Sequence, residues 1–368
     1  MMNWDVAVIG GGPAGSTAAA FTAKAGLKTL LIDRAVLPRE KVCGDCLNPG
    51  CWEVFNQLGV AAEIAALPSA HLRWVAFTNL RGCRIEHQFP NAGPPETGVR
   101  RSALDHALLV NAEKAGAEIW QGEPVTGVER GWLIKTGRRQ VRTKFLVAAD
   151  GRNSSVARFL GAFPRTRTDR VACQTYFSAD RPSHIALELN RLGYMGIGTV
   201  GQGAVNLCIV ARPKQIEEMR FRISERFGLT PEHRWNTVAP LSRRPVETDD
   251  PTLFYVGDAA RVVEPFTGEG IFYALKTGWL AAESIIESHR NGPSFRHRYA
   301  ERHRQLYAGR LWINQLARLS VLHPGVSSTC LEVLRFWPWP LEQLTRRVVG
   351  MSACSSGEEL GEVRARAE

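Results

Sequence analysis

The sequence predicts an α/β protein in which a parallel βαβ unit is interrupted by a mostly antiparallel sheet and followed by helices. The chain opens on an apolar strand that runs into a glycine-rich turn, alternating segments follow from 171 to 210, and helical patterns broken by prolines fill the region after 291. Such changes in hydrophobic period are the primary signals of secondary structure. With 368 residues, 44% of them hydrophobic, the chain can bury a large core.

The first strand, at 6–9, leads directly into a G-x-G-x-x-G motif, Gly10-Gly11-Gly12-Pro13-Ala14-Gly15. Gly10 permits the tight turn, Gly12 lets a pyrophosphate approach the backbone, and Gly15 lets a helix at 13–25 pack closely on the strand. The free N–H groups and the dipole of that helix favour phosphate binding. The order of strand, motif and helix predicts a Rossmann-type dinucleotide site.

A second apolar strand, at 28–32, ends in Asp33, which follows Gly15 by 18 residues. An acid at this distance is expected to bind a ribose hydroxyl, and Arg34 stands next to it. The loop at 34–50 contains Cys43-Gly44-Asp45-Cys46 and precedes a helix at 51–58. A long loop in this position is often functional.

The chain then leaves this layer and returns to it. A hairpin is expected from 74–78 and 84–89, and a helix to about 115 begins where Ser102 and Asp105 have the spacing of a capping box. Short strands follow near 118–121, 125–129 and 132–136.

Two later strands end in turns that can also present backbone N–H groups to a ligand. The strand at 144–149 ends in Asp150-Gly151, and the strand at 252–256 ends in Gly257-Asp258. The segment Pro265-Phe-Thr-Gly268-Glu269-Gly270 then introduces a long amphipathic helix to about 289.

Alternating segments from 171 to 210 predict a mostly antiparallel sheet, and a helix is expected at 214–227. This part of the chain is the expected substrate layer. We therefore expect a discontinuous nucleotide-binding domain at about 1–70, 98–160 and 250–290. Substrate-domain insertions are expected at about 71–97 and 161–249, and a C-terminal helical segment at 291–368.

The C-terminal segment predicts helices interrupted at Pro324 and at Trp337-Pro338-Trp339-Pro340, with a frayed last dozen residues. The tryptophans suit peripheral contact with a membrane, although a packed turn between helices is the favoured interpretation.

Composition narrows the class of protein. No apolar run reaches the length of a membrane span and no signal peptide is recognisable, so we expect a cytoplasmic protein, with membrane association as an alternative. Eight scattered cysteines suit reduced thiols. A net charge of +10 is compatible with binding to nucleic acid, to an anionic membrane or to an acidic cofactor. No nucleic-acid-binding motif is present in the sequence, so we expect no nucleic-acid partner.

The glycine motif with Asp33, the Asp150-Gly151 turn, and Gly257-Asp258 with 265–270 occur in the order found in para-hydroxybenzoate hydroxylase-like flavoproteins. Within that superfamily, the loop Pro38-Arg-Glu-Lys-Val-Cys-Gly44 resembles that of the geranylgeranyl reductase branch. The resemblance covers about residues 4–290 and implies an FAD-dependent oxidoreductase.

The resemblance also implies roles for particular residues. Asp33 would bind the adenosine ribose, Arg101 would lie beside the FAD phosphates, and Asp258 would contact the ribityl chain and pyrophosphate. The helix after Gly268 would point its N-terminus at the flavin pyrimidine ring, where a helix dipole stabilises negative charge. The expected cofactor-binding residues are Gly10, Gly12, Pro13, Ala14, Gly15, Asp33, Arg34, Arg101, Asp150, Gly151, Gly257, Asp258, Gly268 and Gly270.

Cys43, Gly44 and Asp45 are expected to border the reacting face of the flavin and are the candidate catalytic residues. Plain thiols lining a pocket are the favoured interpretation of Cys43, Cys46 and Cys51. A redox pair of Cys43 and Cys46 is an alternative, and a metal site is disfavoured because no fourth ligand is suitably spaced.

Two reactions remain open. Reduction or dehydrogenation of a hydrophobic isoprenoid, polyketide or lipid-like substrate is slightly favoured over hydroxylation of an aromatic one, and NAD(P)H or another donor would reduce the flavin. The stretch Tyr194-Met-Gly-Ile-Gly198-Thr keeps only the tyrosine of the branch's aromatic pattern, and halogenase motifs are absent. A third hypothesis is a non-catalytic flavoprotein that binds a protein or membrane partner. The oligomeric state is left open.

Overall fold

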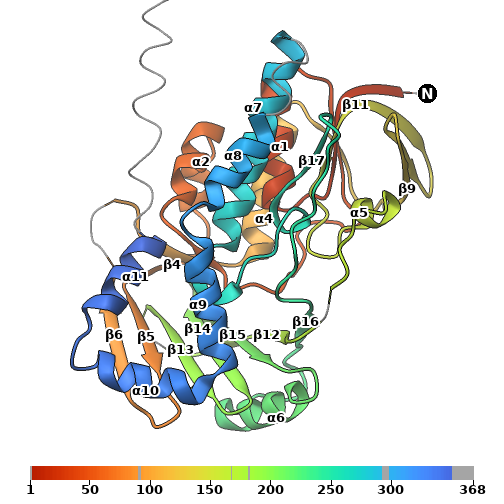
Figure 1. The fold of residues 1–368 in the computed structure, drawn as a ribbon. Coiled ribbons are helices and arrows are strands. Elements are labelled where there is room, and N and C mark those ends of the chain that lie inside the picture. The colour runs from red at the N-terminus through yellow and green to blue at the C-terminus, as the bar shows by residue number, and fades with distance from the viewer. Residues whose placement is uncertain (1, 90–92, 167, 181–182, 292–297, 350–368) are drawn as a thin grey trace, which may run out of the picture.

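The computed structural model describes residues 2–89, 93–166, 168–180, 183–291 and 298–349 (Figure 1). Within these residues the strands form two seven-stranded sheets and one three-stranded sheet. The predicted α/β class is confirmed, with a largely parallel first sheet, a mostly antiparallel second sheet and C-terminal helices.

The first sheet has the order β8-β2-β1-β11-β10-β9, with β17 also paired to β11. The strands β8, β2, β1, β11 and β17 are parallel, whereas β10 pairs antiparallel with both β11 and β9. The strands are β1 (Met2–Ile9), β2 (Thr29–Ile32), β8 (Glu118–Trp120), β9 (Val125–Glu129), β10 (Leu133–Thr136), β11 (Gln140–Ala148) and β17 (Leu253–Tyr255).

Both faces of this sheet are buried, which explains the unbroken apolar runs of its central strands. Val6 and Val8 belong to the core on the helical face, while Ala7 and Ile9 belong to the core on the opposite face. The helices of this part of the chain are α1 (Pro13–Lys24), α2 (Cys51–Leu58), α3 (Ala61–Ala65), α4 (Arg101–Lys114), α5 (Ser155–Phe159) and α7 (Gly270–Asn291).

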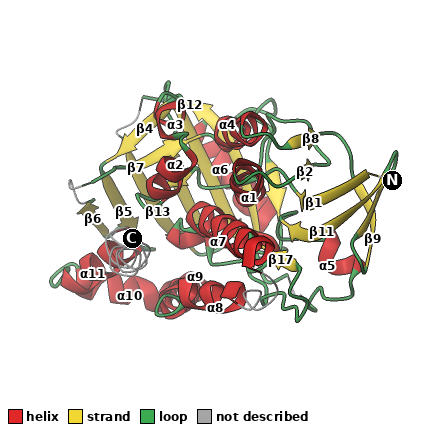
Figure 2. Ribbon diagram, turned by 90° about the horizontal axis from the view of Figure 1, so that it is seen from above, coloured by secondary structure: helices red, strands yellow, loops and turns green. Residues whose placement is uncertain are grey.

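Helix α1 packs against both α4 and α7. The contact with α7 is close because Gly278 has no side chain, and a Cβ there would lie 2.2 Å from the Ala14 carbonyl oxygen. This packing sets the start of α1 against the middle of α7, and the two helices lie side by side (Figure 2).

The second sheet has the order β16-β12-β15-β14-β13-β5-β6 and is antiparallel except for the β13–β5 pair. Helix α6 (Ile216–Phe227) covers one face through Ile216, Met219 and Ile223. The strands are β5 (Trp74–Thr78), β6 (Arg84–Gln88), β12 (Val171–Ser178), β13 (His184–Asn190), β14 (Gly193–Thr199), β15 (Ala204–Ala211) and β16 (Asn236–Val238).

A small third sheet, which the sequence analysis did not predict, connects the two larger ones. Its strand order is β3-β7-β4. The strands are β3 (Cys46–Leu47), β4 (Ser69–Leu72) and β7 (Glu96–Val99). These strands have two to four residues, too few for a periodic pattern to be recognised.

Within the described residues, four helices follow α7, and they form a row along one side of the molecule (Figure 2). They are α8 (Arg298–Tyr307), α9 (Leu311–Leu322), α10 (Pro324–Leu334) and α11 (Trp339–Val349), so the predicted breaks at Pro324 and at 337–340 are confirmed. The frayed last dozen residues lie outside the described residues. Among the helices that are described, none is both long enough and apolar enough to cross a bilayer.

Two local predictions are wrong. The capping box is absent: α4 begins at Arg101, and Ser102 donates its hydroxyl to Glu40 while Asp105 accepts hydrogen bonds from Arg101. The favoured packed turn at 337–340 is also absent, because Trp337 and Trp339 are 62% and 57% exposed and stack on each other.

Candidate active site

One cavity joins the turns at the ends of the parallel strands to a chamber beneath the second sheet. Its cofactor end, as defined here, is lined by Gly12, Pro13, Ala14, Lys41, Arg101, Gly151, Arg152, Gly257 and Asp258. The other part, the apolar chamber, is lined by β14, by Phe77 and Phe266, and by residues of α9 and α11.

The glycine turn has the geometry that the sequence predicts. Gly10 has a φ of +109°, and a Cβ there would lie 2.3 Å from the Ala149 carbonyl oxygen. A Cβ on Gly15 would lie 1.8 Å from the Gly10 oxygen, whereas the nearest atom to a Cβ on Gly12 is Arg39 Nη2 at 4.0 Å. Gly10 and Gly15 therefore permit close backbone packing, while Gly12 leaves open space in the cavity wall.

The acid after β2 is fixed against the same turn. The Asp33 carboxylate accepts hydrogen bonds from the Gly11 N–H at 2.6 Å and from the Ala35 N–H at 2.8 Å, and Arg39 Nη2 lies 3.7 Å away. Asp33 is buried and does not line the cavity itself. Arg34, also predicted to bind the cofactor, is exposed and does not line the cavity either.

Arg101 is a buried cation at the cofactor end. Its Nε and Nη2 atoms each lie 2.9 Å from an oxygen of Asp105, which forms a bidentate ion pair within α4. Lys41 lies in the same wall, and burial lowers its pKa to about 8, with the neighbouring Arg101 as the second cause. The cofactor end thus presents positive charge that the sequence indicated only through Arg101.

The two predicted aspartates have different partners. Asp258 accepts a hydrogen bond from Arg152 at 3.1 Å, and although burial opposes ionisation, Arg152, Lys41 and Arg101 lower its pKa below the ordinary value. Asp150 instead accepts the N–H groups of Ser155 and Val156 at the start of α5 and does not line the cavity. A carboxylate at a helix N-terminus satisfies orphan donors, which accounts for its position.

The turn before α7 lies against the cavity as predicted, with Gly268 at a φ of +72° and Gly270 at the start of the helix. Between them, Glu269 is buried and pairs with Arg310 at 2.7 Å. No local motif indicates this pair, because Arg310 stands at the start of α9, 41 residues away.

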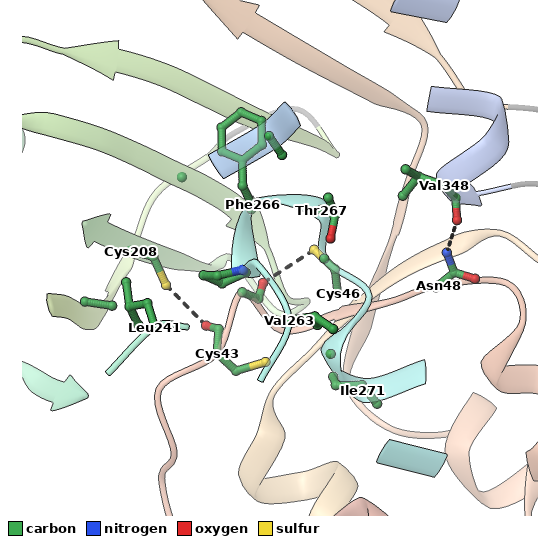
Figure 3. A pocket seen from close by; sticks show the side chains of 18 of the residues that line it. Cys43, Cys46, Asn48, Cys208, Leu241, Val263, Phe266, Thr267, Ile271 and Val348 are labelled. Carbon is green, nitrogen blue, oxygen red and sulfur yellow. Dashed lines mark hydrogen bonds between the residues drawn. The ribbon is translucent and has the colours of Figure 1, made fainter. Parts of the chain in front are cut away.

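The Cys43–Cys46 loop lies over the cavity (Figure 3). The Cys43 carbonyl accepts hydrogen bonds from Asn206 Nδ2 and Cys208 Sγ, and the Cys43 N–H donates to Gln174. Cys43 and Gly44 line the cavity. The second sheet therefore fixes the loop by hydrogen bonds to its backbone.

Asp45, predicted beside the flavin, does not line the cavity. It is fully buried, has a φ of +57°, and accepts the Tyr176 hydroxyl hydrogen bond. Burial raises the pKa of Asp45 to about 7, and the hydrogen bond from Tyr176 opposes that shift. The left-handed backbone turns this side chain toward β12, so its position indicates that it anchors the loop.

The clustered cysteines are free thiols in the structure. Burial raises the pKa of Cys43 and raises that of Cys46 still further, which disfavours the reactive thiolate form. Cys51 is buried in the core below the loop and has no exposed surface. Cys43 and Cys46 both lie in the cavity wall, the arrangement expected of thiols that line a pocket.

The walls of the apolar chamber come from distant segments. Tyr194, Gly196 and Gly198 alternate along β14 on the cavity side, and Phe266 packs edge-to-face on Tyr194 with centroids 5.2 Å apart. Opposite them, α9 and α11 contribute Leu316 and Leu344 among other residues. The helical wall could not be predicted from the sequence because no local motif indicates it.

The chain belongs to the FAD binding domain family, whose model matches residues 3–312. This match agrees with the open wall at Gly12 and with Arg152 Nε, a buried polar atom at the cofactor end that lacks a partner in the described structure. The site residues therefore fit a polar, phosphate-bearing cofactor.

Three similar proteins place the chain more closely. It is 32% identical over 312 residues to menaquinone reductase of Mycolicibacterium smegmatis, covering 76% of this chain and 75% of that protein. It is 30% identical to digeranylgeranylglycerophospholipid reductase of Thermoplasma acidophilum, covering 81% and 83%. The crystal structure of a geranylgeranyl bacteriochlorophyll reductase-like protein from Thermoplasma acidophilum matches with a TM-score of 0.77 and 25% identity, over 100% and 96% of the chains. The chain is a flavin oxidoreductase by family.

Proposed function

We propose that this protein is an FAD-dependent reductase that adds hydrogen to, or removes it from, a hydrophobic substrate of the isoprenoid type. The observation that carries the proposal is the continuity of one cavity from the glycine turns at the cofactor end to the apolar chamber. A substrate in the chamber would lie next to a cofactor bound at those turns. Two of the relatives are named as reductases of menaquinone and of an isoprenoid phospholipid.

The cofactor end would bind FAD through its backbone and its charges. The turn at Gly12 and the start of α1 would contact the pyrophosphate, Asp33 the adenosine ribose, and Asp258 the ribityl chain. Arg101 and Arg152 would balance the phosphate charge. When bound, FAD supplies the hydride chemistry, and the protein's contribution is to orient the substrate and exclude water.

The apolar chamber supports the choice of substrate class. Gly196 and Gly198 add no side chain to the wall, and a Cβ at Gly198 would meet no atom within 4 Å. Around them, Phe77, Phe266 and Leu316 provide apolar surface. A wide apolar chamber gains free energy by burying hydrocarbon, at about 25 cal/mol for each Å² removed from water.

We also propose that the protein takes its substrate from a lipid surface. Phe336, Trp337 and Trp339, named here the aromatic face, are 87%, 62% and 57% exposed, and Arg335 beside them is exposed too. Helix α11, which begins at Trp339, also lines the apolar chamber. Tryptophan and arginine side chains together favour the interface of an anionic membrane, so the aromatic face would bring the chamber to its lipid substrate.

The domain division follows the same proposal. The first sheet with α1, α4 and α7 would form the discontinuous FAD-binding domain, and the second sheet would form the substrate domain.

The electron donor is proposed to be NAD(P)H or another reductant. Anaerobic mixing of the holoprotein with NADH, NADPH or a non-physiological reductant would identify the donor through the loss of flavin absorbance.

The test is anaerobic photoreduction of the holoprotein, followed by addition of polyprenyl quinones or polyprenyl lipids. Aromatic compounds are added to a parallel sample that is then exposed to oxygen. The proposal expects flavin absorbance to return with a polyprenyl compound in the absence of oxygen. Oxygen incorporation into an aromatic product without anaerobic reoxidation would instead identify a monooxygenase, and the absence of any substrate effect would identify a non-catalytic flavoprotein.

Membrane access is tested separately by sedimentation with vesicles that contain anionic phospholipid. Trp337→Ser combined with Trp339→Ser should reduce the bound fraction severalfold, while Phe221→Ser, at an exposed apolar residue on α6, should leave it unchanged. Equal binding of all three proteins would contradict a role for the aromatic face.

A further inference from the structure

Glu96 is a buried carboxyl group in the cavity wall that neither the family match nor the proposed FAD contacts explain. It stands at the start of β7, is 6% exposed, and lines the cavity. Its Oε2 atom is buried and has no hydrogen-bond partner within the described residues. An unpartnered buried polar atom is costly, so its retention in a cavity wall indicates a ligand-facing role.

The side chains around Glu96 include thiols and another acid. No cation is among the causes of the shift in the Glu96 pKa. Its pKa is raised to about 8, first by burial and second by the Glu269 carboxylate, which is itself paired with Arg310. Cys46 on β3 and Cys51 on α2 are the other titratable groups it influences, and Tyr194 lies on β14, which packs against β7. Glu96 is therefore protonated at neutral pH.

The cavity holds a second carboxyl group with the opposite behaviour. Asp258 lies at the cofactor end, where Arg152, Lys41 and Arg101 lower its pKa despite burial. In active sites, two carboxyl groups whose pKa values are shifted in opposite directions typically have different roles. The group with the raised pKa acts as a proton donor, and the group with the lowered pKa stabilises charge. Asp258 is ionised and cannot donate a proton at neutral pH, whereas Glu96 can.

The other proton-bearing side chains in the chamber are weaker acids. Burial raises the pKa of Cys43, and it raises the pKa values of Cys208 and Tyr194 further. Among the described cavity-lining residues outside the cofactor end, Glu96 is therefore the strongest acid that still carries its proton near pH 7.

We propose that Glu96 is the proton donor for reduction of the substrate double bond, an inference that rests on the proposed function. The π bond breaks and two C–H bonds form, one with the hydride taken from the reduced cofactor and the other with the Glu96 proton. The cofactor is thereby oxidised by two electrons, and the carboxylate left on Glu96 recovers a proton from solvent. An isolated isoprenoid double bond has no carbonyl group to accept charge, so a placed acid is required at the site.

The experiment compares the wild type, Glu96→Gln and Glu96→Asp in single-turnover reoxidation of the photoreduced flavin by a polyprenyl lipid that carries no quinone ring, with the reduced lipid measured as product. Glutamine has nearly the same shape but cannot supply the proton, so Glu96→Gln should slow reoxidation about 100-fold, within the usual range for a lost general acid. FAD content should be unchanged. Glu96→Asp should keep part of the rate, and Glu63→Gln, at an exposed residue of α3, should match the wild type.

The pH profile separates proton donation from a structural role. The wild-type rate should be constant at low pH and fall about tenfold per unit above the pKa of Glu96, which lies near 8, while Glu96→Gln should lack this decrease. An equal rate and an equal profile for wild type and Glu96→Gln would overturn the inference and leave the proposed function standing.

A second readout does not depend on turnover. The infrared difference spectrum of wild type minus Glu96→Gln should contain the band of a protonated carboxyl group at pH 6.5, and this band should disappear as pH rises through about 8. If no polyprenyl compound reoxidises the wild-type flavin, the proposed function fails. In that case the absence of this band would show independently that Glu96 does not hold a proton.

Discussion

The two ends of the cavity are built by different means. At the cofactor end, backbone turns at Gly12, Gly151 and Gly257 form the wall, and each directly follows a parallel strand. In the apolar chamber, side chains from β5, β14, α9 and α11 form the wall, and these elements are far apart in the sequence. One end thus depends on local backbone geometry, while the other depends on how distant elements pack.

The largest effect should come from filling the glycine turn. Gly15→Val should prevent stable folding, because even its Cβ would lie 1.8 Å from the Gly10 oxygen. Gly12→Val should fold with a melting temperature near that of the wild-type apoprotein yet bind far less FAD, since its side chain would enter open space in the cavity. Thermal unfolding and flavin content measure the two effects. Equal unfolding temperatures for the two variants would contradict the division of roles between these glycines.

The buried ion pair at the cofactor end should have the next largest effect. Arg101→Ala leaves the Asp105 carboxylate buried, with Arg39 at 3.4 Å as its remaining cation, and should lower the free energy of unfolding by about 3–5 kcal/mol.

The matched control for this substitution is Arg84→Ala in the exposed pair with Glu86, which should cost less than about 1 kcal/mol. Denaturant unfolding measures both values. Comparable losses would show that burial does not set the strength of the Arg101 pair.

The anchor of the Cys43–Cys46 loop should make stability depend on pH. Because the folded-state pKa of Asp45 is raised to about 7, the folded protein binds more protons than the unfolded chain between about pH 4 and 7. Its contribution to stability is present at low pH and is lost as pH rises through 7. Asp45→Asn should remove this contribution, by at most about 4 kcal/mol between pH 4 and 8.

Urea unfolding at several pH values tests the loop anchor, with Asp249→Asn, at an exposed residue, as the control. Glu96 adds a decrease in the same direction, so the comparison is between the variants and the wild type. A pH dependence in Asp45→Asn as steep as that of the wild type would contradict a buried neutral Asp45.

The smallest effect on stability should come from the aromatic face. Trp337→Ser and Trp339→Ser remove side chains that are more than half exposed, so the free energy of unfolding should change by less than about 0.5 kcal/mol. Chemical denaturation measures this. A loss of several kcal/mol would show that the tryptophans belong to a packed core and would remove the basis for a membrane-contact role.

The same contrast explains what the sequence could predict. The turns at Gly10–Gly15 and Gly257–Asp258 were recognised because a strand and its following turn are contiguous, and the parallel order brings them to one edge. Glu96 and Arg310 were missed because each reaches the cavity only through tertiary contacts. Asp45 was placed beside the flavin because the family resemblance implies that position for the whole loop at 43–46, and Cys43 and Gly44 do line the cavity. Its left-handed backbone, which no motif indicates, directs it elsewhere.

The side chains of the chamber also limited the functional prediction. The alternation of apolar residues predicted a strand at β14. The sequence could not show that Gly196 and Gly198 face the cavity, because this depends on α6 covering the opposite face of the sheet. The reductase hypothesis could therefore be drawn from motifs, while the width of the chamber and its helical wall required the structure.

The central claim is that the apolar chamber holds the substrate beside the cofactor end, and Gly198→Phe tests it most directly. A Cβ at Gly198 meets no atom within 4 Å, so phenylalanine should fill the chamber without disturbing β14. FAD content and photoreduction should equal those of the wild type and of Gly137→Phe, an exposed control with similar open space. Anaerobic reoxidation of the flavin by a polyprenyl compound should be at least about tenfold slower. Reoxidation by Gly198→Phe at the wild-type rate would contradict the account.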